Sequence, residues 1–196
     1  MLYHLFFPLA DEISIFNLFR YITLRTGGAT VTALFVSFVV GPALIRWLKS
    51  KQAEGQPIRE DGPQSHLITK KGTPTMGGVL ILLALGIATL LWADLTNEYV
   101  WAVLLVTLGF GAIGFVDDYK KLTKRSSDGL PGRVKLVLQF IIGGGAAIWI
   151  SAISEPHLSQ GLAIPFVKDF LVPLGWFFLP WAIIVMVGAS NAVNLT

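Results

Sequence analysis

The run Ala33-Leu-Phe-Val-Ser-Phe-Val-Val40 forms the centre of an apolar stretch that covers about residues 26–48. A bilayer with a hydrocarbon core of ~30 Å is crossed by about 20 consecutive apolar residues in a helix. Four further stretches of this kind follow along the chain, at about 76–93, 99–116, 134–153 and 174–195. The sequence therefore predicts five membrane-spanning helices.

Composition supports this prediction and excludes other classes of protein. Of the 196 residues, 54% are hydrophobic and 14% are charged, whereas a soluble domain averages about 25% charged residues. Disordered chains need low hydrophobicity, and a membrane β-barrel would alternate polar and apolar residues. The 0 cysteines exclude disulfides and thiolate metal sites. We expect an all-α, polytopic transmembrane bundle, with residues 1–196 as a single membrane domain.

Residues 1–20 are apolar but too short and too interrupted to span the membrane. Pro8, Asp11 and Glu12 break the apolar pattern early, and no Lys or Arg precedes it as in a signal peptide. We expect residues 1–20 to form an interfacial segment that leads into the first span.

The basic residues predict the orientation of the spans. The first and third loops, with their flanks, contain 12 of the 15 Lys and Arg residues. Cytoplasmic loops carry the excess of Lys and Arg in membrane proteins. The prediction is therefore an outside N-terminus and cytoplasmic loops at 49–73 and 117–133. The third loop is more basic than orientation requires, so it is either a topology signal or an anion site.

Two adjacent aspartates, Asp117 and Asp118, follow the third predicted span. At a helix C-terminus the dipole disfavours a carboxylate by ~0.3–1 kcal/mol, and adjacent like charges add to this cost. One interpretation is a helix end neutralised by Lys120 and Lys121. The other is a Mg²⁺ site, in which carboxylates, water and substrate phosphate supply the hard oxygen ligands.

Two other polar segments are predicted on the same membrane face as the aspartates. The segment Lys70-Lys-Gly-Thr-Pro-Thr-Met-Gly-Gly78 leads into the second span, as an anion cradle or as an ordinary capped helix start. Asn191 and Asn194 share one face of the last span, facing a polar site or joining helices by hydrogen bonds. Together the three segments suit a phosphate substrate that meets a lipid substrate.

These segments resemble the phospho-N-acetylmuramoyl-pentapeptide transferase family, within the polyprenyl-phosphate N-acetylhexosamine-1-phosphate transferases. The resemblance is carried by four stretches: Asp61-Gly-Pro-Gln-Ser-His66, Lys71-Gly-Thr-Pro-Thr-Met-Gly-Gly78, Gly114-Phe-Val-Asp-Asp-Tyr-Lys-Lys121 and Asn191-Ala-Val-Asn-Leu-Thr196. It implies a Mg²⁺-dependent transfer of phospho-MurNAc-pentapeptide from its UDP carrier to undecaprenyl phosphate. The products would be lipid I and UMP, in the peptidoglycan synthesis that underlies cell-wall biogenesis, cell shape and cell division.

The resemblance also implies roles for individual residues. Asp117 and Asp118 would be catalytic and would bind Mg²⁺ together with a further aspartate outside this chain. The implied substrate-binding residues are Lys70, Thr75, Lys121, Lys135, Asn191 and Asn194. Members of the family have about ten spans, so the chain resembles the N-terminal half, and we expect this polypeptide alone to be inactive.

The expected setting is the bacterial cytoplasmic membrane, with the active site facing the cytoplasm. The expected partners are the two substrates and membrane lipids. The sequence is also compatible with a homodimer, and no nucleic-acid partner is expected. The transfer could proceed by direct attack of the acceptor phosphate or through an aspartyl-phosphate intermediate. Alternatives are a related transferase with another UDP-sugar, or half of a membrane transporter.

Overall fold

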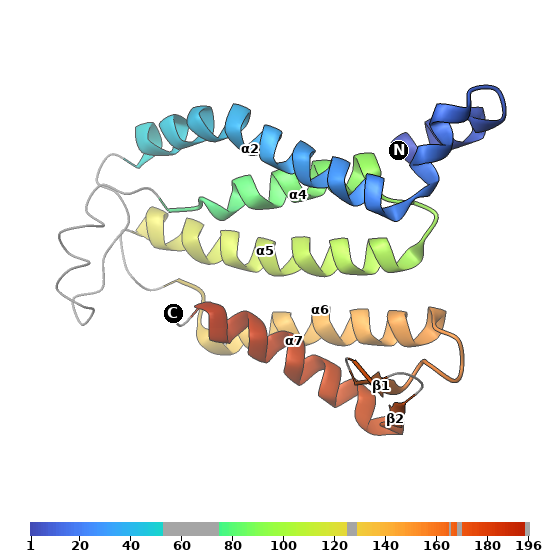
Figure 1. Ribbon diagram of the computed structural model, residues 1–196. Helices are drawn as coiled ribbons and strands as arrows, with labels where there is room; N and C mark the ends of the chain where they lie inside the picture. The colour runs from blue at the N-terminus through green and yellow to red at the C-terminus, as the bar shows by residue number, and fades with distance from the viewer. Residues whose placement is uncertain (53–74, 125–128, 165, 168–169, 195–196) are drawn as a thin grey trace.

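The computed structural model describes residues 1–52, 75–124, 129–164, 166–167 and 170–194, without the side chains of residues 193 and 194. Five long helices dominate this part of the chain (Figure 1). They are α2 (Ile22–Lys51), α4 (Gly78–Trp92), α5 (Glu98–Lys124), α6 (Gly132–Ile153) and α7 (Phe178–Asn194). The all-α class is confirmed.

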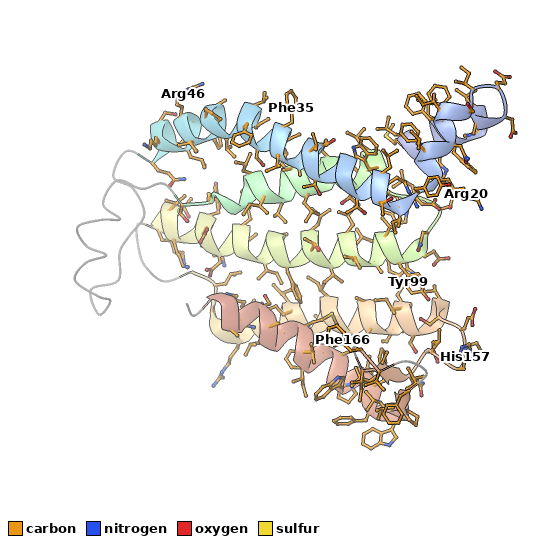
Figure 2. The ribbon with its side chains drawn as sticks, viewed as in Figure 1. Arg20, Phe35, Arg46, Tyr99, His157 and Phe166 are labelled. Carbon is orange, nitrogen blue, oxygen red and sulfur yellow. The ribbon has the colours of Figure 1, made fainter. Side chains whose placement is uncertain are left out.

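The five helices lie side by side in the order α2, α4, α5, α6, α7, so that each packs mainly on its neighbours in the chain (Figure 1). The middle helices α5 and α6 are the more enclosed. In an 18-residue apolar stretch of each helix, 17% of α5 and 22% of α6 is buried, against 6% for α2 and for the stretch that contains most of α7. Most large apolar side chains are therefore exposed, and in Figure 2 Phe35 points away from the neighbouring helices. Such extensive apolar exposure suits lipid and is rare in a soluble monomer.

The predicted count of five spans is not confirmed. Within the described residues, four helices are long and apolar enough to cross a membrane, and α4 is a shorter apolar helix of 15 residues. At about 1.5 Å per residue, α4 is about 22 Å long. The helix is short because Met76 takes a positive φ of 71° before it, and Ala93 is extended after it.

Helix α5 extends beyond the predicted third span. The span was expected to end at residue 116, but the helix continues to Lys124. Asp117 and Asp118 therefore lie inside α5, more than one turn before its end. The helix dipole acts within the last turn, so the predicted dipole cost at these two carboxylates is wrong.

The other boundaries depart from the prediction in smaller ways. The last span begins with a 3₁₀ turn, η3 (Gly175–Phe177), before α7. The loop before it contains a two-stranded antiparallel hairpin, β1 (Gly161–Ala163) and β2 (Leu171–Pro173). The first 20 residues form three short helices: α1 (Leu2–Phe6), η1 (Phe7–Asp11) and η2 (Ser14–Arg20).

Small residues bring neighbouring helices close together. A Cβ at Gly111 of α5 would collide with the Leu82 side chain of α4, and a Cβ at Gly28 of α2 would lie 2.5 Å from the Trp92 ring. Ala84 and Ala88 of α4 are buried as well. Small residues at helix interfaces compensate for the lack of a hydrophobic driving force between helices in lipid.

We predict that the two ends of the row lie on opposite sides of the membrane. His157 lies at the same end as Tyr99 and Arg20 in Figure 2, whereas α5 ends at Lys124 at the opposite end. These 196 residues contain no cysteine, so each substitution introduces the first thiol into this part of the protein. A membrane-impermeant thiol reagent added to intact cells should label His157→Cys and leave Lys124→Cys unlabelled. Labelling of both variants, or of Lys124→Cys alone, would contradict this orientation.

Candidate functional site

Asp117 and Asp118 lie at the end of the helical row where α2 ends, α4 and α6 begin and α7 ends (Figure 1). The chain leaves its helices there, so backbone groups and polar side chains can gather beside the last turns of α5. The sequence placed the aspartates, the start of the second span and the end of the last span on one face. The structure confirms that these segments share one end of the row.

Asp117 is held on both carboxylate oxygens. Its Oδ2 accepts a hydrogen bond of 2.7 Å from Lys121 Nζ, one turn later on α5. Its Oδ1 accepts a hydrogen bond of 2.7 Å from the backbone N–H of Leu130, just before α6. The side chain is only 13% exposed. Charge-assisted bonds of this length fix the carboxylate and favour its ionised form.

Asp118 is tied to a different segment and is more open. Its Oδ2 accepts a hydrogen bond of 2.9 Å from the hydroxyl of Thr75, just before α4. Its Oδ1 lies 3.9 Å from Lys121 Nζ, and its side chain is 33% exposed. Of the two carboxylates, Asp118 is thus the more accessible to a ligand.

Gln52, which sequence reasoning missed, holds Thr75 in place. Its Oε1 accepts a hydrogen bond of 2.9 Å from the Thr75 N–H, and its Nε2 donates one of 3.4 Å to the Thr75 carbonyl. Gln52 follows the end of α2, so the site joins α2, α4 and α5. A single glutamine at the start of a loop gives no signal in the sequence that could have identified this role.

The predicted basic residues are distributed unevenly around the aspartates. Lys121 contacts both carboxylates directly. Lys135 lies in the first turn of α6, and its positive charge favours the ionised form of Asp117. Among the described residues, no hydrogen bond joins the two side chains. Lys70 lies outside the described residues. The site thus has positive charge from α5 and α6 beside two carboxylates.

Asn191 is engaged in a bond between helices. Its Nδ2 donates hydrogen bonds to the Gln139 side-chain oxygen of α6, at 2.7 Å, and to the Val187 carbonyl, at 2.8 Å. Gln139 is 2% exposed, and sequence reasoning missed this buried polar residue. Its isolation in an otherwise apolar predicted span is the signal that could have revealed it. Asn194 is the last residue of α7, and its side chain lies outside the described part.

The donor set at the aspartates suits a hard divalent cation that completes its shell elsewhere. The described residues contain no group of three or more His, Cys, Asp or Glu side chains that could enclose a metal. Mg²⁺ commonly takes one or two carboxylates and leaves its remaining positions to water and substrate phosphates. Asp118, the more exposed carboxylate, and Asp117 beside it fit this mode of binding.

Comparison with known proteins identifies matches to both halves of this site. The family model for glycosyl transferase family 4 matches residues 100–196, which include both aspartates. Signature 1 of the phospho-N-acetylmuramoyl-pentapeptide-transferases matches residues 70–82, which include Lys70 and Thr75. The hydrogen bond between Thr75 and Asp118 joins the two matched segments.

Two curated relatives match over the whole chain. A phospho-N-acetylmuramoyl-pentapeptide-transferase from Granulibacter bethesdensis is 66% identical over 196 residues, which are 100% of this chain and 54% of the relative. A protein of the same name from Maricaulis maris is 52% identical over 201 residues, which are 100% of this chain and 55% of that relative. The chain spans about half the length of these curated relatives.

We predict that the bond between Gln139 and Asn191 stabilises the packing of α6 on α7. Gln139→Leu and Asn191→Leu should each lower thermal stability in detergent, and the double variant should lose less than the sum of the two. The expected coupling is about 0.6 kcal/mol, the average for such bonds between membrane helices. Additive losses, combined with a raised KM in Asn191→Leu alone, would instead assign Asn191 to substrate binding.

Proposed function

This chain belongs to the phospho-N-acetylmuramoyl-pentapeptide-transferase family, and on that premise we propose that the whole protein makes lipid I. It transfers phospho-MurNAc-pentapeptide from UDP-MurNAc-pentapeptide to undecaprenyl phosphate and releases UMP. The reaction belongs to peptidoglycan synthesis, and we place it at the cytoplasmic face of the bacterial inner membrane.

The observation that carries this proposal is the group of Thr75, Asp117, Asp118 and Lys121 at one end of a row of apolar helices. A lipid acceptor keeps its chain in the hydrocarbon and its phosphate at the surface. A nucleotide donor approaches from water. A site at the end of the helices is where the two substrates meet.

The residues of this chain support positioning and charge stabilisation, which dominate phosphoryl-transfer catalysis. An oxygen of undecaprenyl phosphate attacks the phosphorus atom that carries the sugar. The bond from that phosphorus to the bridging oxygen breaks, and UMP leaves with the electron pair. In this proposal Lys121 and Lys135 attract the phosphates, and Thr75, whose hydroxyl donates to Asp118, orients that carboxylate.

We propose direct attack rather than an aspartyl-phosphate intermediate. A phosphate monoester, with a second pKa of about 6, is already largely ionised at neutral pH and needs little activation. Asp117 has both oxygens in hydrogen bonds, to Lys121 and Leu130, which makes it a constrained nucleophile. These contacts suit a carboxylate that orients other groups.

Asp118 and Asp117 would hold Mg²⁺ in this proposal, with water and substrate phosphate in its other positions. When bound, Mg²⁺ supplies neutralisation of the charge on the pyrophosphate. The further aspartate implied by the family resemblance lies outside this chain. The part of the protein described here supplies two carboxylates, and we propose that this polypeptide alone is inactive.

We predict that both aspartates are needed for turnover. In the full-length enzyme, Asp117→Asn and Asp118→Asn should each lower kcat by at least ~10², because both remove a charge that the reaction uses. Asp94→Asn, at the opposite end of the row, is the matched control, since Asp94 contacts Thr96 and His4 rather than the site. UMP release measures the rates. Turnover near that of the unmodified enzyme in both test variants would assign the pair to structure.

The two lysines should differ in their effect. Lys135→Ala should mainly raise KM for a phosphate-bearing substrate, because Lys135 makes no direct bond to Asp117 among the described residues. Lys121→Ala should also lower kcat, because it frees the Asp117 Oδ2. Lys121→Arg should restore activity only partly, since a planar guanidinium fits this pair differently from an ammonium. Full activity of both alanine variants at limiting substrates would contradict a role in binding phosphate.

A further inference from the structure

The backbone at Gly129 approaches the Asp117 side chain unusually closely. A Cβ built at Gly129 would collide with the Asp117 Oδ1 and would lie 2.7 Å from Asp117 Cγ and 2.8 Å from Lys121 Cε. Real Cβ atoms essentially never come closer than 3.0 Å to another heavy atom. The next residue, Leu130, donates its backbone N–H to the same Oδ1 at 2.7 Å.

Two other glycines near Asp117 in the sequence do not share this closeness, and it does not come from backbone dihedrals. Gly132, three residues later, and Gly114, three residues before Asp117, have nothing within 4 Å of an added Cβ. Gly175 is the glycine with a positive φ in the described part of the chain. The site therefore uses the missing side chain of Gly129, and its conformational freedom is not the reason for a glycine there.

We propose that Gly129 is a positioning residue for Asp117. Because Gly129 has no side chain, the backbone segment before α6 can lie against the carboxylate. The Leu130 N–H then donates to Oδ1 while Lys121 donates to Oδ2. A side chain at position 129 pushes the carboxylate away and breaks both bonds. Asp117 has a short side chain with few rotatable bonds, so its carboxylate cannot move aside without leaving its preferred rotamer.

The consequence for the reaction rests on the proposed function. A shift of the carboxylate changes how the site meets the transferred phosphate, and misplacement by about 1 Å can lower a rate by about 10²-fold. Substrate binding depends on many contacts elsewhere. Gly129→Ala should therefore lower kcat much more than it raises either KM.

The first experiment is steady-state kinetics of the full-length enzyme with undecaprenyl phosphate and the UDP-linked substrate. Gly129→Ala should lower kcat by about 10- to 100-fold and change each KM less than twofold. Gly132→Ala and Gly114→Ala are the matched controls, because an added methyl group meets nothing at either position. A kcat for Gly129→Ala within twofold of both controls would overturn the proposal.

The second experiment tests the contact itself and does not depend on activity. Gly129→Ala should lower the Tm in detergent by a few degrees in the parent enzyme. In the Asp117→Ala background, the space left by the carboxylate accommodates the methyl group, so the same change should cost little or nothing. An equal loss of Tm in the two backgrounds would show that Gly129 does not act through Asp117 and would also overturn the proposal.

The two experiments separate this inference from the proposed function. If the unmodified full-length enzyme releases no UMP from these substrates, the proposed function fails, and the Tm cycle still reports whether Gly129 positions Asp117. If Asp117→Asn loses its turnover while Gly129→Ala keeps it, the proposed function stands and the role of Gly129 fails. A large rise in KM without a fall in kcat would assign position 129 to substrate binding and contradict positioning.

Discussion

Lipid offers no hydrogen-bond partners, and this constraint shapes the whole molecule. Every backbone group inside the hydrocarbon must be satisfied within the chain, so the apolar stretches become helices. Polar groups that must meet water are then found at the ends, where the chain turns and water is near. The aspartates, Thr75 and Gln52 all lie at one such end. The location of the candidate site thus follows from the lipid around the helices as much as from the residues of the site.

The local architecture of the site depends on the two carboxylates bonding to different segments of the chain. Asp117 is fixed on one side by Lys121 of its own helix and on the other by the Leu130 backbone. Asp118 reaches across to the segment before α4 and is the more exposed. One carboxylate thus organises the start of α6 and the other organises the start of α4. Adjacent positions in a helix point about 100° apart, which lets one dipeptide join two different segments.

Sequence reasoning predicted the helical class, the approximate positions of the helices and the shared face of Thr75 and Asp118. These follow from apolar length and from the alternation of direction between successive spans. It did not predict where α5 ends, because a helix can continue past the hydrocarbon, as α5 does to Lys124. It also missed Gln52, Gly129 and Gln139. Their roles depend on which side chain or backbone atom lies opposite, and spacing in one sequence carries no such information.

The packing of each helix on its neighbours in the chain has a consequence for biogenesis. Since α2 contacts α4, α4 contacts α5, α5 contacts α6 and α6 contacts α7, every helix finds its partner as soon as it is made. Contacts between near neighbours carry a small entropic cost of closing the intervening loop, and chains rich in them assemble quickly. The row can therefore grow one helix at a time as the ribosome delivers it, with no early helix waiting in the bilayer for a late partner within this part of the chain.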